Sequence, residues 1–209
     1  MKTHALLMID FQRDFCARGG YADLQGGVAW AREIIPAAQR LLAGARGCGV
    51  FIVHTREGYA ADLSDVSPPK LARSKAAGAE IGMPGPLGRL LIRGEIGHDF
   101  IDELKPLPGE PIVDKATYGA FCRSELEHTL RSRGIDTVVL AGVTADVCVH
   151  TTLREAIDRG FDARYVRDAI STFDPSLRLA CEQMIGVEGG IWGEITTVDE
   201  IVSTWRKLS

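Results

Sequence analysis

A strand, a sharp turn and an amphipathic helix follow one another between residues 136 and 160, and this unit constrains the fold most strongly. The apolar run 138–141 is typical of a central strand in a parallel sheet, and Gly142 permits a tight exit from it. One helical face after Cys148 carries the apolar residues Val149, Leu153, Ala156 and Ile157. Gly160 then supplies a C-terminal stop. The segment therefore predicts a buried strand whose helix packs back on a parallel sheet.

The same order of strand and helix recurs along the chain. Strands are predicted at residues 5–9, 50–55, 112–113, 137–141, 163–166 and 190–192. Helices are predicted around residues 35–46, 124–133, 175–185 and 198–205, besides the one that begins at Cys148. This alternation predicts an α/β fold with a doubly wound, mostly parallel sheet and helices on both faces. Because 45% of the 209 residues are apolar, they can fill one substantial core, and we expect a single domain over residues 1–209.

Composition excludes several classes of partner. The formal net charge is -4, and 24 Lys and Arg are interspersed with 28 Asp and Glu, so no basic stripe is available for nucleic acid or an anionic membrane. No apolar run is long enough to span a membrane, and the first residues lack the pattern of a signal peptide. The five cysteines are odd in number and free of CxxC spacing. We therefore expect a cytoplasmic protein whose partner is a small molecule.

Three chemically complementary residues stand at the ends of predicted strands: Asp10, Lys115 and Cys148. The carboxyl ends of parallel strands meet at one edge of a sheet, where active sites gather, so we expect these side chains to lie together. Cys148 also begins a helix, whose unpaired N–H groups and dipole favour a thiolate. Taken singly, the three have simpler interpretations as a buried structural cysteine, a turn acid and a surface lysine. Together they form a set suited to nucleophilic catalysis.

Three motifs carry a resemblance to a known family. They are Met-Ile-Asp-Phe-Gln-Arg-Asp-Phe at residues 8–15, Val-Asp-Lys at 113–115 with Gly-Ala-Phe at 119–121, and Ala-Gly-Val-Thr-Ala-Asp-Val-Cys-Val-His-Thr-Thr-Leu-Arg-Glu-Ala at 141–156. Through them the chain resembles the isochorismatase-like cysteine hydrolases over nearly its whole length. Within that superfamily, the loops His-Thr-Arg-Glu-Gly at 54–58 and Arg-Gly-Glu at 93–95 resemble those of the biuret and ureide amidohydrolases.

The resemblance implies a Rossmann-like, isochorismatase-like hydrolase fold and a cysteine-dependent amidohydrolase. Cys148 would attack a carbamoyl or amide carbonyl, Asp10 would move the proton, and Lys115 would hold the aspartate. It also implies a cis peptide bond between Val143 and Thr144, and an oxyanion hole made by the N–H groups of Thr144 and Cys148. The expected reaction cleaves the C–N bond of a small biuret-like, N-carbamoyl or ureidoacrylate-like compound, or of an amide, through a thioester.

The sequence also bears on metals and cofactors. Nicotinamidases of the superfamily bind a divalent ion through an acid and histidines, with an Asp-x-His pattern after the second strand. This chain has no acid two residues before His54 and no partner histidine before His98. A single histidine at a strand end is more often a hydrogen-bonded core residue than a ligand. We therefore predict that the protein uses no metal and no cofactor.

Three further residues are expected at the substrate. The resemblance places Phe15 and Tyr118 in the pocket wall, with ordinary core packing as the alternative. Glu188 stands where the biuret branch has glutamine, and a carboxylate there would favour neutral, donor-rich ureides over acidic ones. Exposure to solvent at a helix end is the alternative for Glu188. Ala-Thr-Tyr at 116–118 in place of Pro-Gly-Lys, and Ala145 in place of threonine, also depart from that branch, which counts against biuret itself.

The connection 56–110 is too long to be an idle loop in a compact domain. We expect it to cap the site, with Arg56, Glu57 or Arg73 facing substrate or a neighbouring subunit. Solvated surface charge is the alternative for each of them. Related enzymes form dimers or tetramers, which implies a homodimer or homotetramer here.

Other functions stay open at this stage. A metal-independent nicotinamidase-like enzyme or another aliphatic amidase would use the same residues, whereas an isochorismatase would cleave a vinyl ether without the cysteine. A nucleotide-binding module shares the α/β alternation, but the residues after the first strand lack its glycine-rich turn. A redox-sensing protein would use Cys148 and leave Asp10 and Lys115 without a role.

Overall fold

The computed structural model describes residues 3–208. The strands are β1 (His4–Ile9), β2 (Phe51–Glu57), β3 (Pro84–Gly85), β4 (Gly88–Arg89), β5 (Ile112–Lys115), β6 (Thr137–Val143), β7 (Asp162–Ser171) and β8 (Glu194–Thr196). The α-helices are α1 (Arg13–Cys16), α2 (Ala29–Glu33), α3 (Ile35–Gly47), α4 (Pro68–Ala76), α5 (Leu126–Arg131), α6 (His150–Asp158), α7 (Pro175–Ile185) and α8 (Val198–Leu208). Short 3-10 turns cover Asp23–Gln25, Asp102–Leu104 and Val187–Gly189, and a π-helical turn, Ala145–Val149, precedes α6.

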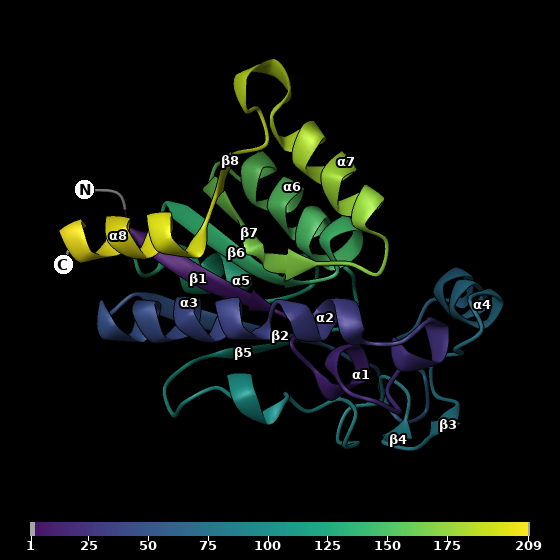
Figure 1. Cartoon of the computed structure of the whole chain (residues 1–209). Coiled ribbons are helices and arrows are strands. Elements are labelled where there is room, and N and C mark those ends of the chain that lie inside the picture. The colour runs from purple at the N-terminus through teal and green to yellow at the C-terminus, as the bar shows by residue number, and fades with distance from the viewer. Residues whose placement is uncertain (1–2, 209) are drawn as a thin grey trace.

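Six strands form one sheet in the order β5-β2-β1-β6-β7-β8, and every neighbouring pair in it is parallel (Figure 1). The chain adds β2 and β5 on one side of β1, and then β6, β7 and β8 on the other side. The strand order therefore reverses between β1 and β6, and ligand sites of such sheets lie at this point, outside the carboxyl ends of the strands. The predicted α/β fold with a mostly parallel, doubly wound sheet is confirmed.

Both faces of the sheet are covered by helices. In β1, Leu6 and Met8 belong to the apolar layer that contains α3 and α8, including the buried Trp205. The alternate residues Leu7 and Ile9 belong to the opposite layer, with residues of α5 and α6. Burial on both faces explains why these strands are nearly continuous apolar runs in the sequence. It also leaves the ends of the strands as the place for polar chemistry.

A glycine at the end of β6 allows the two central strands to approach. Gly142 has a φ of 139° and lies opposite Ile9 in the strand register. A side chain at Gly142 would place its Cβ only 2.0 Å from the carbonyl oxygen of Ile9. Only glycine fits here, and as a result the residues that follow β1 and β6 lie next to each other.

Several boundaries differ from those predicted. The strand expected at residues 190–192 is wrong, because Gly190 and Gly193 have φ values of 91° and 109° and form a turn; the strand is β8, further along the chain. Cys148 lies within the π-helical turn and not at the first residue of α6. The second strand, predicted to end at residue 55, continues to Glu57. This last difference bears directly on the site.

The long connection after β2 contains structure of its own. It includes α4 and the antiparallel ribbon of β3 and β4. Figure 1 shows both at the right of the view, beyond the carboxyl ends of the central strands. Among residues 3–208, no helix combines the length and apolar character that crossing a membrane requires.

Candidate active site

The three predicted strand-end residues come together. Asp10 directly follows β1, Lys115 ends β5, and Cys148 lies in the turn after β6. The Lys115 Nζ donates a hydrogen bond of 2.7 Å to Asp10 Oδ2, and both side chains are fully buried. On the other side, Thr55 Oγ1 donates to Asp10 Oδ1 over 2.5 Å. The carboxylate of Asp10 is therefore fixed by an ammonium group and a hydroxyl.

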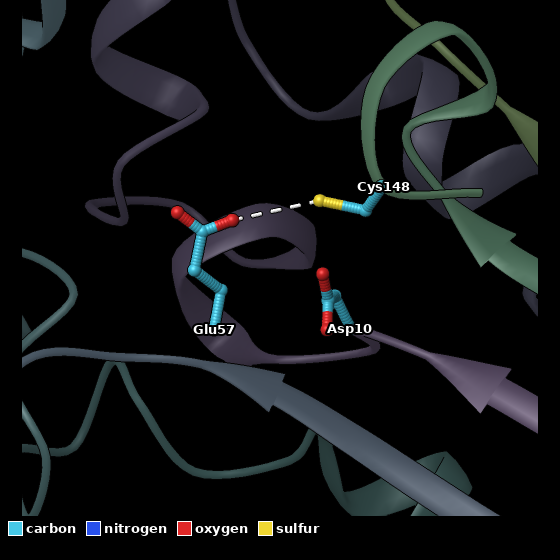
Figure 2. Close-up of side chains that lie close together, drawn as sticks. All are labelled: Asp10, Glu57 and Cys148. Carbon is cyan, nitrogen blue, oxygen red and sulfur yellow. Dashed lines mark hydrogen bonds between the residues drawn. The ribbon is translucent and has the colours of Figure 1, made fainter. Parts of the chain in front are cut away.

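A second carboxylate, that of Glu57, lies beside the thiol. Glu57 is the last residue of β2 and is buried. Its Oε1 accepts a hydrogen bond of 2.7 Å from the Tyr59 hydroxyl and lies 2.9 Å from Lys70 Nζ. Its Oε2 accepts a hydrogen bond of 3.5 Å from Cys148 Sγ, as Figure 2 shows, and lies 3.8 Å from Lys115 Nζ. Burial rules out the surface position that was the alternative for this residue.

The charges of this cluster balance. Burial alone would raise the pKa of Glu57, but the ammonium groups of Lys115 and Lys70 hold it below its usual value. Burial alone would lower the pKa of Lys115, but the Asp10 carboxylate raises it above its ordinary value. Each of the two buried acids therefore has a lysine as its partner, which offsets the cost of burying these groups.

The thiol behaves differently from the sequence-based expectation. Burial raises the pKa of Cys148 well above the usual 9.0, and the opposing effect of Lys115 is smaller. The preference for a thiolate that we expected from the helix start is therefore outweighed. A base must remove the proton before the sulfur can attack, and the carboxylates of Asp10 and Glu57 are close enough to do so. One oxygen of Asp10, one oxygen of Glu57 and the Cys148 Sγ all lie within 4.8 Å of one another.

The backbone around Cys148 forms a tight turn. The peptide bond between Val143 and Thr144 is cis. The carbonyl oxygen of Thr144 accepts hydrogen bonds from the N–H groups of Val147 and Val149, at 3.3 Å and 3.1 Å. Both Thr144 and Cys148 line the cavity described next. The oxyanion hole expected from their N–H groups stays a prediction.

A cavity of about 360 Å³ opens beside Cys148. Its volume falls within the range of small-molecule sites, about 300–1,000 Å³. Phe15 and Tyr118, both predicted to contact substrate, line it, and Phe15 packs edge-on against Tyr21 at a centroid distance of 5.9 Å. Lys70, on α4, places its Nζ 3.8 Å from the centroid of the Tyr118 ring. The connection after β2 therefore does cover one side of the cavity.

Sequence reasoning missed other parts of this wall. Tyr21, Gln25 and Phe173 also line the cavity. Phe173 follows the end of β7, so the strand-end rule that found Cys148 would have found it too. Tyr21 in a loop and Gln25 in the 3-10 turn both precede α2, and no local pattern marks them.

The charged candidates separate into two groups. Arg73 lines the cavity and, among residues 3–208, has no ion pair or side-chain hydrogen bond. Arg56 does not line it and pairs with Asp114 at 2.7 Å. Glu188, expected at the substrate, does not line it either. Glu188 is exposed, with a φ of 50°, in the turn that follows α7. We therefore withdraw Glu188 as a substrate contact.

The donor set bears on metal binding. Among the described residues, Asp10, Glu57 and Cys148 form the group of three that could hold an ion. The Lys115 ammonium already lies 2.7 Å from Asp10 and 3.8 Å from Glu57, so it supplies the positive charge that these acids need. A further cation does not fit this charge balance. His54 is buried, and its Nε2 lies 2.8 Å from Glu110 Oε2, as a hydrogen-bonded core residue would.

The parallel sheet, with its order reversing between β1 and β6 and helices on both faces, is Rossmann-like. Residues 4–189 match the isochorismatase domain, and the chain belongs to the isochorismatase family. Ureidoacrylate amidohydrolase RutB of Variovorax paradoxus (strain S110) is 31% identical over 205 residues, which cover 96% of this chain and 81% of that protein.

Solved structures give the same fold. An isochorismatase family protein from Desulfovibrio vulgaris subsp. vulgaris str. Hildenborough aligns with a TM-score of 0.81 and 26% identity, over 99% of this chain and 100% of that one. A cysteine hydrolase from Pseudomonas syringae pv. phaseolicola 1448A aligns with a TM-score of 0.84 and 24% identity, over 99% and 93% of the two chains.

Proposed function

We propose that this protein is a cysteine-dependent amidohydrolase that cleaves a C–N bond of a small ureide or amide through a thioester. The observation that carries the proposal is the buried Cys148 thiol beside two carboxylates, in the wall of a cavity of small-molecule size. The coarser statement, an amidohydrolase acting on C–N bonds other than peptide bonds, follows from the family and from its ureidoacrylate amidohydrolase relatives.

In the first half of the proposed reaction, Asp10 takes the S–H proton while the Cys148 sulfur bonds to the carbonyl carbon. The C=O electron pair moves to oxygen, where the N–H groups of Thr144 and Cys148 stabilise it; one such donor is worth about 2.7–4 kcal/mol. Asp10 then gives its proton to the nitrogen, the C–N bond breaks, and ammonia or an amine leaves. Lys115 holds the Asp10 carboxylate in place through both transfers.

In the second half, water hydrolyses the thioester. Asp10 takes a proton from the water while the water oxygen bonds to the acyl carbon. The C–S bond then breaks, and the sulfur of Cys148 takes the proton back from Asp10. The acid product leaves and the resting thiol is restored.

The finer proposal concerns the substrate. Arg73 is a cation of the cavity wall without a partner among the described residues, so it suits a substrate that carries a carboxylate. An N-carbamoyl amino acid and ureidoacrylate, the compound in the name of the relatives, are of this kind. The preference for neutral ureides that we expected rested on Glu188, whose exposed position removes that reason.

Release of ammonia tests the proposal. The panel contains biuret, ureidoacrylate, an N-carbamoyl amino acid and a simple aliphatic amide, and the enzyme is first treated exhaustively with chelator. We expect ammonia from at least one compound, and an acyl adduct on Cys148 in the mass spectrum of a quenched reaction. The mechanism would be contradicted if none of the compounds released ammonia. It would also be contradicted if chelation removed the activity and zinc, iron or manganese restored it.

A homodimer or homotetramer stays a prediction. Leu177 and Met184 on α7 and Val187 in the 3-10 turn that follows it are all exposed. Association would bury these side chains. Light scattering after size exclusion measures the state directly.

A further inference from the structure

We infer that Glu57 is a second carboxylate of the catalytic centre. Its Oε2 accepts a hydrogen bond from the N–H on the carbonyl carbon that Cys148 attacks, and it thereby selects amides and ureides against esters. The inference rests on the proposed function, since it needs Cys148 to be the nucleophile.

The position of Glu57 is the first argument. Its Oε2 lies 3.5 Å from the Cys148 Sγ. When the sulfur bonds to the carbonyl carbon, the nitrogen on that carbon is only one bond further away. Figure 2 shows the carboxylates of Glu57 and Asp10 on different sides of the thiol, and all three reactive atoms lie within 4.8 Å. A nitrogen leaving from the acyl carbon is therefore within reach of both acids.

The hydrogen bonds of Glu57 are the second argument. Its Oε1 is already used by the Tyr59 hydroxyl at 2.7 Å and by Lys70 at 2.9 Å. Its Oε2 has Lys115 at 3.8 Å, beyond hydrogen-bond length, and the S–H of Cys148. Once the thiol gives up its proton, Oε2 loses that donor. A substrate N–H can then replace the S–H.

The chemistry of the substrate follows from these contacts. An ionised carboxylate can only accept hydrogen bonds, so it favours an N–H in front of it. The oxygen of an ester has no hydrogen and would set its lone pairs against Oε2. With one N–H held by Glu57, the nitrogen lone pair is free to face Asp10, which delivers the proton. Glu57 therefore orients the leaving nitrogen, and Asp10 transfers the proton to it.

Glu57→Gln is the informative variant. Both neighbours of Oε1 are donors, so the amide oxygen of the new side chain will face Tyr59 and Lys70. Its NH₂ group will then stand where Oε2 stood. The NH₂ group and the substrate N–H are both donors, so the hydrogen bond to substrate is lost, while the size of the side chain is unchanged.

The test compares a primary amide with the methyl ester, or methyl carbamate, of the same acyl group. Both give the same thioester on Cys148, so the hydrolysis of the thioester is common to the two. We expect Glu57→Gln to lower kcat/KM for the amide by about 10- to 100-fold, the size of one charge-assisted hydrogen bond, and for the ester by less than about threefold. Retained ester turnover also reports that the variant is folded.

Equal losses on amide and ester would overturn the inference, because Glu57 would then act in a shared step or in folding alone. Lys70→Met is the matched control: it removes a partner of the same carboxylate and keeps Oε2. We expect it to keep the wild-type ratio of amide to ester within about threefold. A ratio altered as much as by Glu57→Gln would assign the effect to charge balance and refute the hydrogen bond.

A wild-type measurement covers the case in which Glu57→Gln does not fold. An N-methyl amide keeps one N–H and an N,N-dimethyl amide has none. We expect most of the loss in kcat/KM to fall on the second methylation, and an equal loss at each step would overturn the inference. Failure of the wild type to cleave any amide would instead refute the proposed function itself.

Discussion

The two ends of the cavity are built differently. We call the cluster of Asp10, Glu57, Lys115 and Cys148 its inner end; Glu57 and Cys148 line the cavity, and Asp10 and Lys115 lie behind them. We call Arg73, Tyr118 and Phe173 its outer end. The inner residues lie on strands or directly after them, whereas the outer residues lie on α4 and in loops. Inner side chains are at most 4% exposed, but Tyr118 and Phe173 are 38% and 56% exposed.

This difference indicates that the inner end carries out the bond cleavage, whereas the outer end determines which substrate is preferred. At the inner end each carboxylate has an ammonium partner, and the sheet fixes the positions, so little has to move when bonds change. At the outer end the side chains reach solvent and lie on loops or a peripheral helix, where substitutions are tolerated more easily. Substitutions at the inner end should therefore change the rate on every amide and ureide, and those at the outer end the preference among these compounds.

The largest effect should come from the nucleophile. Cys148→Ala removes the sulfur that forms the thioester, and we expect a loss in kcat of at least about 10⁴-fold on all substrates. The thermal midpoint should change little, because one sulfur is removed and no large volume. Ammonia release and a thermal scan measure the two. Turnover within tenfold of the wild type would take Cys148 out of the mechanism.

The buried ion pair should come next. Lys115→Met leaves the Asp10 carboxylate buried without its ammonium partner, which costs about 3–5 kcal/mol of folding free energy. We expect kcat/KM to fall about 10³-fold, because the Asp10 carboxylate then loses the ammonium group that orients it for both proton transfers. Denaturant unfolding and kinetics provide the measurements.

The double variant Lys115→Met with Asp10→Asn is the control for this prediction. It removes both charges, so it should regain part of the lost stability without regaining activity. Recovery of activity in the double variant would show that Asp10 is not the group that moves the proton.

The thiol pKa gives a pH prediction for the inner end. Because the pKa of Cys148 is raised above 9.0, the thiolate fraction should grow about tenfold per pH unit below that value. Alkylation of Cys148 by neutral iodoacetamide, followed by peptide mapping, should therefore accelerate about 100-fold from pH 7 to pH 9 without levelling. A rate that is flat over this range would mean that a carboxylate already holds the proton in the resting enzyme.

The outer end should show a smaller and selective effect. Arg73→Ala removes an exposed cation, and we expect kcat/KM to fall about fivefold for a ureide that carries a carboxylate, the size of a solvent-screened ion pair. A neutral ureide of similar size should be unaffected. Arg73→Lys is the matched control and should keep most of the preference. Equal effects on the acidic and the neutral compound would remove Arg73 from substrate recognition.

The inner end was largely predictable from the sequence. Strands buried on both faces produce apolar runs, and the end of each run marks the carboxyl edge of the sheet. This was enough to bring Asp10, Lys115 and Cys148 together. Glu57 was expected to face substrate only as part of the long connection, because the last residues of β2 are polar and look like the start of a loop. Its place at the end of a strand, beside the thiol, was not expected. Its burial depends on Lys70 and Lys115, which come from later parts of the chain.

The outer end was not predictable in the same way. Phe173 follows β7 and obeys the strand-end rule, but the other residues lie on α4 and in loops whose paths depend on contacts far apart in the sequence. Tyr21 precedes α2, whereas Phe173 follows β7, and yet both line one cavity. A motif match can also mislead in such loops. It pointed to Glu188, but the glycine-rich turn after α7 leaves that side chain in solvent.

The smallest effect should therefore be that of Glu188→Gln. An exposed side chain outside the cavity lies in neither end of it, so the ratios of kcat/KM for biuret, an N-carbamoyl amino acid and a simple amide should stay within about twofold of those of the wild type. The same three ratios for Arg73→Ala provide the contrast. If Glu188→Gln shifts them and Arg73→Ala does not, the residues that select the substrate lie on the turn after α7. Since no residue of that turn lines the cavity within one chain, a second copy would then have to bring it there, and the outer end would be shared between subunits.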